Sequence, residues 1–117
     1  MKMDKESIVI CDLTHTSSGS YATNFTPYPI ASIKSNVLHF SKYKNKLEID
    51  IFKDPEKFIK VFLSKNPKLV GFSNYIWNGE LSYELAKEIK LRSPETLVVF
   101  GGPNFPLDDE TREEWLR

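Results

Sequence analysis

The 117-residue sequence has a single cysteine, Cys11, only two histidines and no net charge. One cysteine excludes an internal disulfide, a cysteine-rich zinc site and an iron–sulfur cluster held by this chain alone. Sixteen basic residues balance sixteen acidic ones, so the chain lacks the basic excess of proteins that bind nucleic acid or acidic membranes. No apolar run approaches the ~20 residues that span a bilayer, and the charged start lacks the apolar segment of a signal peptide. We therefore expect one soluble, cytoplasmic domain over residues 1–117, without nucleic-acid or membrane partners.

Four short apolar runs predict four strands, and they are Ser7–Cys11, Leu47–Phe52, Lys68–Ser73 and Thr96–Phe100. The second run alternates apolar with acidic residues for most of its length, which is typical of a half-exposed edge strand. The first run predicts a strand buried on both faces, and the third and fourth are continuous enough to predict central strands.

Helical patterns follow each of these runs. The first helix should begin near Pro29, and the second at Asp54-Pro55, where Asp54 can cap the free N–H groups. The third should cover about 80–91, and the fourth should begin near Asp108 or Asp109. The apolar residues that we expect to face the core from the first three helices are Ile30, Ile33, Val37 and Phe40, then Phe58, Ile59, Phe62 and Leu63, then Leu81, Leu85, Ala86 and Ile89.

The alternation of strands and helices predicts an α/β fold with parallel strands and right-handed crossovers. With the alternating strand at the edge, the order becomes 2-1-3-4, a doubly wound, Rossmann-like sheet of the flavodoxin-like type without its fifth strand. In such sheets ligands bind beyond the carboxyl ends of the strands, so the three loops there are the candidate site.

The loop after the first strand, residues 12–27, is far longer than the ~2–6 residues usual at such a connection. It is rich in hydroxyls and has no Lys or Arg, so its hydroxyls and backbone N–H groups could surround a phosphate or another polar group. The candidate residues are Thr14, His15, Thr16, Ser17, Ser18 and Gly19. The alternative is an irregular surface loop.

The other two loops offer different chemistry. Ser73, Asn74, Tyr75 and Trp77 follow the third strand and could form a wall for a flat, largely apolar ligand, although the aromatic residues could instead cap the core. Gly101, Gly102 and Pro103 follow the fourth strand, where paired glycines allow close approach to the backbone. A plain turn is the alternative for these three.

Few residues in the sequence are suited to catalysis. We interpret His15 as a surface residue rather than a metal ligand, His39 as structural, and Cys11 as a small buried hydrophobic residue. No base–nucleophile pair and no metal-ligand spacing stands out, so the sequence predicts no catalytic or metal-binding residue in this chain.

These loops resemble those of cobalamin-binding domains of the methionine-synthase and mutase type. Those domains carry Asp-x-His-x-x-Gly, Ser-x-Leu and Gly-Gly motifs, and this chain has Asp12-Leu-Thr-His15 with Gly19, Ser73-Asn-Tyr75 and Gly101-Gly102. His15 stands one residue later than in the first motif. The chain is more similar to the N-terminal domain of B12-dependent radical SAM enzymes, which commonly lack the axial histidine. Its Thr26-Pro-Tyr-Pro-Ile30, Val70–Asn78 and Val99–Asn104 segments look like that family.

The resemblance implies cobalamin as the cofactor, with its nucleotide tail in a slot beside Gly101 and Gly102. Ser73 would bond to polar atoms of the tail, Tyr75 would wall the slot, and the hydroxyl-rich loop would meet the lower face of the corrin. In the family, the cofactor serves methyl transfer or related radical chemistry beside S-adenosylmethionine and a 4Fe-4S cluster.

That cluster needs a Cys-x-x-x-Cys-x-x-Cys motif, and this chain has only Cys11. We therefore expect an N-terminal piece of a longer enzyme, with the radical SAM domain in cis and this domain not catalytic alone. Without a fifth strand, the strand ending at Phe100 would be an apolar edge that favours association.

Three alternatives stay open or fail on particular residues. Thr16-Ser-Ser-Gly-Ser20 resembles the phosphate loop of an FMN-binding, electron-carrying flavodoxin, although Tyr21 stands where a further hydroxyl is expected. A receiver-like signalling domain fails because Ser73-Asn74 replaces the phospho-acceptor aspartate. A degenerate assembly domain that binds nothing is the third alternative.

Overall fold

The computed structural model describes residues 5–14, 16–17, 20–21, 27–103 and 107–116. Its main sheet has four parallel strands in the order β4-β1-β5-β6: β4 is Leu47–Phe52, β1 is Glu6–Cys11, β5 is Leu69–Ser73 and β6 is Leu97–Gly101. In chain order this is 2-1-3-4, so the predicted doubly wound, flavodoxin-like arrangement is confirmed. The long loop after β1 contains a feature that the sequence did not predict, a two-stranded antiparallel ribbon of β2 (Thr16–Ser17) and β3 (Ser20–Tyr21).

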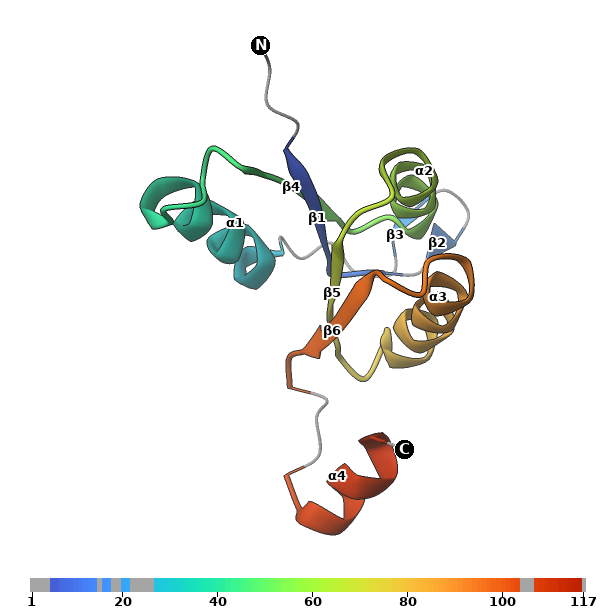
Figure 1. The fold of residues 1–117 in the computed structure, drawn as a ribbon. Helices are drawn as coiled ribbons and strands as arrows, with labels where there is room; N and C mark the ends of the chain where they lie inside the picture. Colours follow the sequence, from blue (N-terminus) through green and yellow to red (C-terminus); the bar gives the residue numbers. More distant parts are fainter. Residues whose placement is uncertain (1–4, 15, 18–19, 22–26, 104–106, 117) are drawn as a thin grey trace.

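Helices cover the two faces of the sheet unequally. Helix α1 (Tyr28–Phe40) lies on one face, and α2 (Pro55–Lys65) and α3 (Gly79–Arg92) lie on the other (Figure 1). Helix α4 (Asp109–Leu116) lies beyond the end of β6, where the Trp115 ring meets the Phe100 ring edge-on at 5.7 Å between centroids. Among the described residues, no helix is long and apolar enough to cross a membrane. The lone α1 leaves part of its face of the sheet uncovered.

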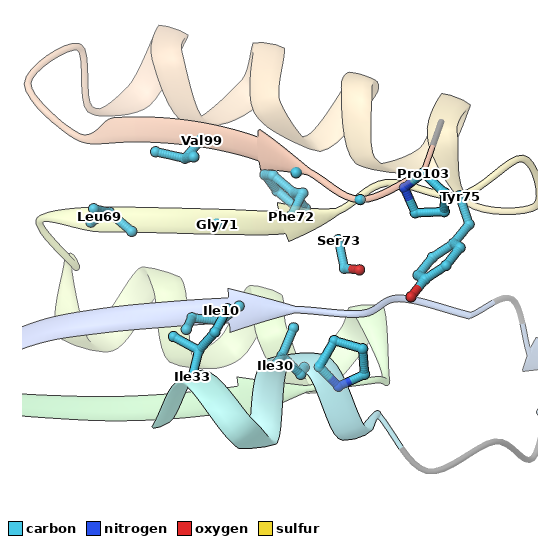
Figure 2. Close-up of a pocket in the computed structure, with 13 residues that line it drawn as sticks. Ile10, Ile30, Ile33, Leu69, Gly71, Phe72, Ser73, Tyr75, Val99 and Pro103 are labelled. Atoms are coloured by element: carbon cyan, nitrogen blue, oxygen red, sulfur yellow. The ribbon is translucent and has the colours of Figure 1, made fainter. Parts of the chain in front are cut away.

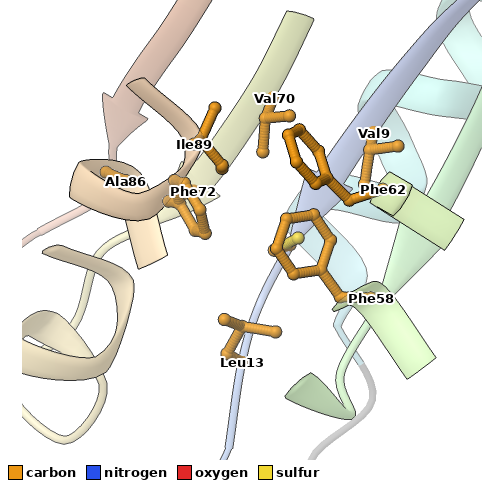
Figure 3. Close-up of a cluster of buried hydrophobic side chains, with 9 residues drawn as sticks. Val9, Leu13, Phe58, Phe62, Val70, Phe72, Ala86 and Ile89 are labelled. Atoms are coloured by element: carbon orange, nitrogen blue, oxygen red, sulfur yellow. The ribbon is translucent and has the colours of Figure 1, made fainter. Parts of the chain in front are cut away.

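The hydrophobic core lies between the sheet and the pair α2 and α3 (Figure 3). Its buried members are Val9, Cys11, Leu13, Phe58, Phe62, Val70, Phe72, Ala86 and Ile89. The side chains of β1 and β5 that face this layer are fully buried, whereas Ile8 and Ile10 on the opposite face are only partly buried. The prediction that β1 is buried on both faces is therefore right for one face only.

Helix α2 begins as its sequence predicts. Asp54 Oδ1 accepts hydrogen bonds from Glu56 N at 2.9 Å and Lys57 N at 3.5 Å, while Pro55 occupies the first turn, where no N–H partner is needed. The helix ends at Asn66, whose left-handed backbone (φ 46°) stops the helix before Pro67. Each of these signals depends only on neighbouring residues, which is why the sequence alone predicts both ends of α2.

Three packing predictions are wrong. Ile59 and Leu63 of α2 are 40% and 62% exposed, because α2 turns Phe58 and Phe62 to the core and leaves these two beside a shallow groove against α3. In α1 only Ile30 is buried; Ile33 is 51% and Phe40 is 83% exposed, since α1 meets the sheet mainly at β4.

The third wrong packing prediction concerns β6, which the continuous apolar run predicts to be a central strand. It lies at the edge of the sheet, and Leu97 and Val99 are 57% and 44% exposed. The expectation of an apolar edge at this strand is confirmed: among the described residues only β5 pairs with β6.

Candidate functional site

The carboxyl ends of β1, β5 and β6 bring three loop segments to one edge of the sheet. Thr14 is buried there, and its N–H donates to Lys53 O at 3.0 Å, which holds the loop after β1 against the loop after β4. Asn74 N donates to Gly101 O at 2.6 Å, so the pairing of β5 with β6 continues one step past the end of β5. The loops after β5 and β6 therefore leave the sheet side by side.

An apolar groove of about 470 Å³ opens between α1 and the uncovered part of the sheet and reaches this edge (Figure 2). It is lined by Ile10, Pro29, Ile30, Ile33, Leu69, Gly71, Phe72, Ser73, Tyr75, Val99, Gly101, Gly102 and Pro103. These residues carry no charged side chain. Tyr75 and Pro103 lie together at the end of the groove, beyond the strand ends, and Ser73 places a hydroxyl nearby (Figure 2). A groove of this composition suits an uncharged, largely apolar group with a few polar atoms.

The floor of the groove is hollow because of one glycine. Ile10, Gly71 and Val99 stand in register on β1, β5 and β6, so the missing side chain lies between two apolar ones. A Cβ on Gly71 would meet Ile10 Cγ2 at 3.7 Å, an ordinary van der Waals contact. The fold therefore has room for a side chain at Gly71, and that side chain would occupy the groove.

The two glycines after β6 have different roles. Gly102 has a φ of +101°, and a Cβ there would lie 2.9 Å from Asn74 O and 3.0 Å from Asn74 N. Nothing lies within 4 Å of the corresponding Cβ position on Gly101. Gly102 is thus required by the backbone that packs on the loop after β5, whereas Gly101 leaves open space at the mouth of the groove.

The aromatic segment after β5 stands at the surface. Tyr75 and Trp77 stack with ring centroids 4.5 Å apart and planes 6° from parallel. Ile76 is 88% and Trp77 is 47% exposed, so these two residues do not cap the core. Tyr75 lines the groove and Trp77, which does not line it, stacks on the Tyr75 ring, so the pair forms an aromatic end wall.

The structure gathers only part of the predicted site. Ser73, Tyr75, Gly101, Gly102 and Pro103 line the groove. Thr14, Asn74 and Trp77 do not line it, and Asn74 instead lines a smaller hollow, of about 260 Å³, against α3. Thr16 and Ser17 form β2, and nothing further is described of their side chains, while His15, Ser18 and Gly19 lie outside the described residues.

The apolar lining from α1, β1 and the strand interiors is absent from the sequence-based prediction. Its members are Ile10, Pro29, Ile30, Ile33, Leu69, Gly71, Phe72 and Val99. Only Gly71 carries a signal, because a glycine inside a buried strand often marks close approach by another group. The isoleucines, Leu69 and Val99 are ordinary core types that face an uncovered layer, and Phe72 borders the groove although its side chain is buried in the core on the other face of the sheet.

Ionisable groups near the strand ends are few. Cys11 is buried, which raises the pKa of its thiol far above the usual range, and the prediction of a buried hydrophobic residue is confirmed. Partial burial raises the pKa of the Asp12 carboxyl, and the charge of Lys53 opposes that shift. Within the described part of the chain, no three His, Cys, Asp or Glu residues cluster closely enough to hold a metal ion.

Comparison with known proteins gives a likeness in structure and none in sequence. No family model matches the chain, and no curated protein matches it. Among solved structures, one described as a novel cobalamin-binding protein from Desulfitobacterium hafniense DCB-2 superposes with a TM-score of 0.56 at 14% sequence identity. The match covers 97% of this chain and 50% of that protein, so the chain spans half its length. At this identity, the likeness establishes a shared fold.

Proposed function

We propose that this domain binds cobalamin at the carboxyl edge of the sheet and takes the nucleotide tail of the cofactor into the groove lined by Ile10, Gly71 and Val99. The observation that carries the proposal is the groove itself, which runs from beneath α1 to the loops after β5 and β6. Its volume of about 470 Å³ lies within the ~300–1,000 Å³ usual for small-molecule sites.

The residues present fit such a tail. The floor and sides of the groove are apolar, which suits a flat, uncharged base, and Ser73 supplies a hydroxyl near the mouth. Gly101 leaves the backbone open at the mouth, and Tyr75 closes the end.

Two further observations support this choice of site and ligand. A second hollow, of about 560 Å³, lies between α3 and β6, but its lining includes none of the residues that follow the strand ends. The solved structure that shares this fold over 97% of the chain is described as a cobalamin-binding protein.

We further propose that the domain works within a longer radical SAM protein. The resemblance of its loops to the N-terminal domain of that family supports this. In such a protein, cobalamin supplies a methyl group or assists a radical reaction, and the other domain holds S-adenosylmethionine and the 4Fe-4S cluster. A reading frame that ends at Arg117 in the gene would overturn the proposal of a longer radical SAM protein.

Absorbance titration distinguishes cobalamin from the FMN alternative, since corrin and flavin absorb at different wavelengths. We expect hydroxocobalamin, and not FMN, to be retained and to raise the melting temperature. Gly71→Val is the matched variant: its side chain would enter the groove, and its Cβ would make only an ordinary 3.7 Å contact with Ile10 Cγ2. Uptake of FMN alone would reject the proposal, and uptake of neither ligand would favour the assembly-domain alternative.

His15→Ala tests the axial ligand separately. His15 stands one residue later than the family histidine, so we expect the spectrum of the bound cofactor to shift little in this variant. A large spectral shift would show that His15 coordinates the cobalt.

A further inference from the structure

Asn78 joins two of the loops that form the proposed site. Its side chain is 1% exposed, and Nδ2 donates to Leu13 O at 3.0 Å and to Ser73 O at 3.1 Å. Its Oδ1 accepts from Tyr75 N at 2.8 Å. One amide group therefore fastens the loop after β1 to the loop after β5 across 65 positions of sequence.

The partners fix the orientation of this amide. Two carbonyl oxygens face Nδ2, and one N–H faces Oδ1; turning the amide over would set like groups against each other at all three positions. Both donors and the acceptor are satisfied, which is the condition for a buried polar group to stabilise a structure rather than weaken it.

The position of Asn78 in the chain makes this arrangement informative. Asn78 is the N-cap residue of α3, where an asparagine side chain usually accepts from the first turn of the helix. Here the side chain makes no capping bond to α3. It reaches back to Tyr75 and across to Leu13 instead, so its hydrogen bonds hold the loops and leave the helix uncapped.

We infer that Asn78 is a positioning residue, which holds Ser73 and Tyr75 at the groove and makes the loops after β1 and β5 move as one unit. Both residues line the groove, and Asn78 bonds to the backbone of each. The effect of Asn78 on ligand affinity rests on the proposed function; its coupling of the two loops does not.

The test compares Asn78→Ala and Asn78→Asp with Thr96→Val as a matched control. Thr96 is likewise 1% exposed, and its Oγ1 donates to Pro67 O at 3.0 Å and shares a 2.7 Å hydrogen bond with Ser93 Oγ. It precedes β6, at the amino ends of the strands, so Thr96→Val removes buried hydrogen bonds without touching the loops at the carboxyl ends. Each variant is titrated with hydroxocobalamin, and amide hydrogen exchange is measured without ligand.

We expect Asn78→Ala to weaken hydroxocobalamin binding about tenfold or more, the change that corresponds to ~1.4 kcal/mol, while Thr96→Val binds as the wild type does. In the exchange experiment, the Thr14 and Tyr75 amides should lose protection in Asn78→Ala. Asn78→Asp keeps an acceptor for Tyr75 N but loses both donors and sets a carboxylate oxygen against Leu13 O and Ser73 O, so the Thr14 amide should lose protection in that variant too.

Wild-type affinity in Asn78→Ala would overturn the positioning role, and unchanged exchange at Thr14 would overturn the coupling of the loops. If the wild-type protein takes up no hydroxocobalamin, the proposed function fails, and exchange at Thr14 alone decides the inference about Asn78. Equal loss of affinity in Thr96→Val would show that lowered stability, rather than loop position, causes the effect.

Discussion

Replacing Gly102 with alanine should destabilise the fold by a mechanism that the structure locates. Its φ of +101° is a backbone conformation that costs a residue with a side chain about 1–3 kcal/mol. The added Cβ would also lie 2.9 Å from Asn74 O and 3.0 Å from Asn74 N, both backbone atoms that cannot rotate away. Together we expect Gly102→Ala to lower the free energy of unfolding by at least about 2 kcal/mol, or roughly 8 °C in melting temperature at ~4 °C per kcal/mol.

Gly101→Ala is the control, because it adds the same methyl group one residue earlier with nothing within 4 Å. A glycine-to-alanine change at a compatible site restricts the unfolded chain and stabilises a protein by about 0.4–1 kcal/mol. Thermal unfolding followed by circular dichroism should therefore place Gly101→Ala at or above the wild type and Gly102→Ala well below it. Equal melting temperatures for the two variants would refute the assignment of different roles to the paired glycines.

Three smaller predictions concern single groups. Asp54→Ala removes the cap of α2 and should cost about 1 kcal/mol, measured by urea unfolding; an unchanged midpoint would contradict the cap. Burial raises the pKa of Asp12, so the folded state holds its proton more tightly and stability falls as pH rises through the shifted range. Asp12→Asn should therefore melt higher than the wild type at pH 7, and the difference should vanish below the ordinary pKa of 3.8. A lower melting temperature of Asp12→Asn at pH 7 would contradict this prediction. Cys11 should react with a thiol reagent only as fast as the protein unfolds, because its thiol is buried and protonated; rapid labelling of the native protein would contradict this.

The sequence was sufficient for the order of the strands because each signal involved was local. The alternation of Leu47–Phe52 identified an edge strand, and Asp54-Pro55 and Asn66-Pro67 marked the two ends of a helix, as the structure confirms. Alternation of strands with helices then left few topologies for a parallel sheet.

The sequence could not show which apolar residues stay uncovered. Val99 and Val70 are the same residue type on neighbouring strands, yet Val99 is 44% exposed and Val70 is fully buried. The difference depends on which helix lies above each residue, and hydrophobic periodicity carries no information about that layer. The same limit explains why periodicity predicts Ile33 of α1 in the core, whereas it lines the groove.

The polar residues of the site are predicted from their place after the strand ends, and not from the chemistry of their side chains. Ser73, Tyr75 and Gly101 follow strands that end at one edge, and the structure brings them to one groove. Asn78 gave no comparable signal, because its partner Leu13 lies 65 positions away and bonds through a backbone oxygen. Contacts between a side chain and a distant main chain follow from the tertiary structure alone.

Equilibrium dialysis of hydroxocobalamin against the wild-type protein and Gly71→Val, run side by side, tests the central claim most directly. If the groove between α1 and the sheet receives the cofactor, the wild-type protein will retain hydroxocobalamin, and Gly71→Val, with its folding checked by circular dichroism, will lose it. Retention by both proteins would place the cofactor elsewhere, and retention by neither would contradict the proposal that this domain binds cobalamin.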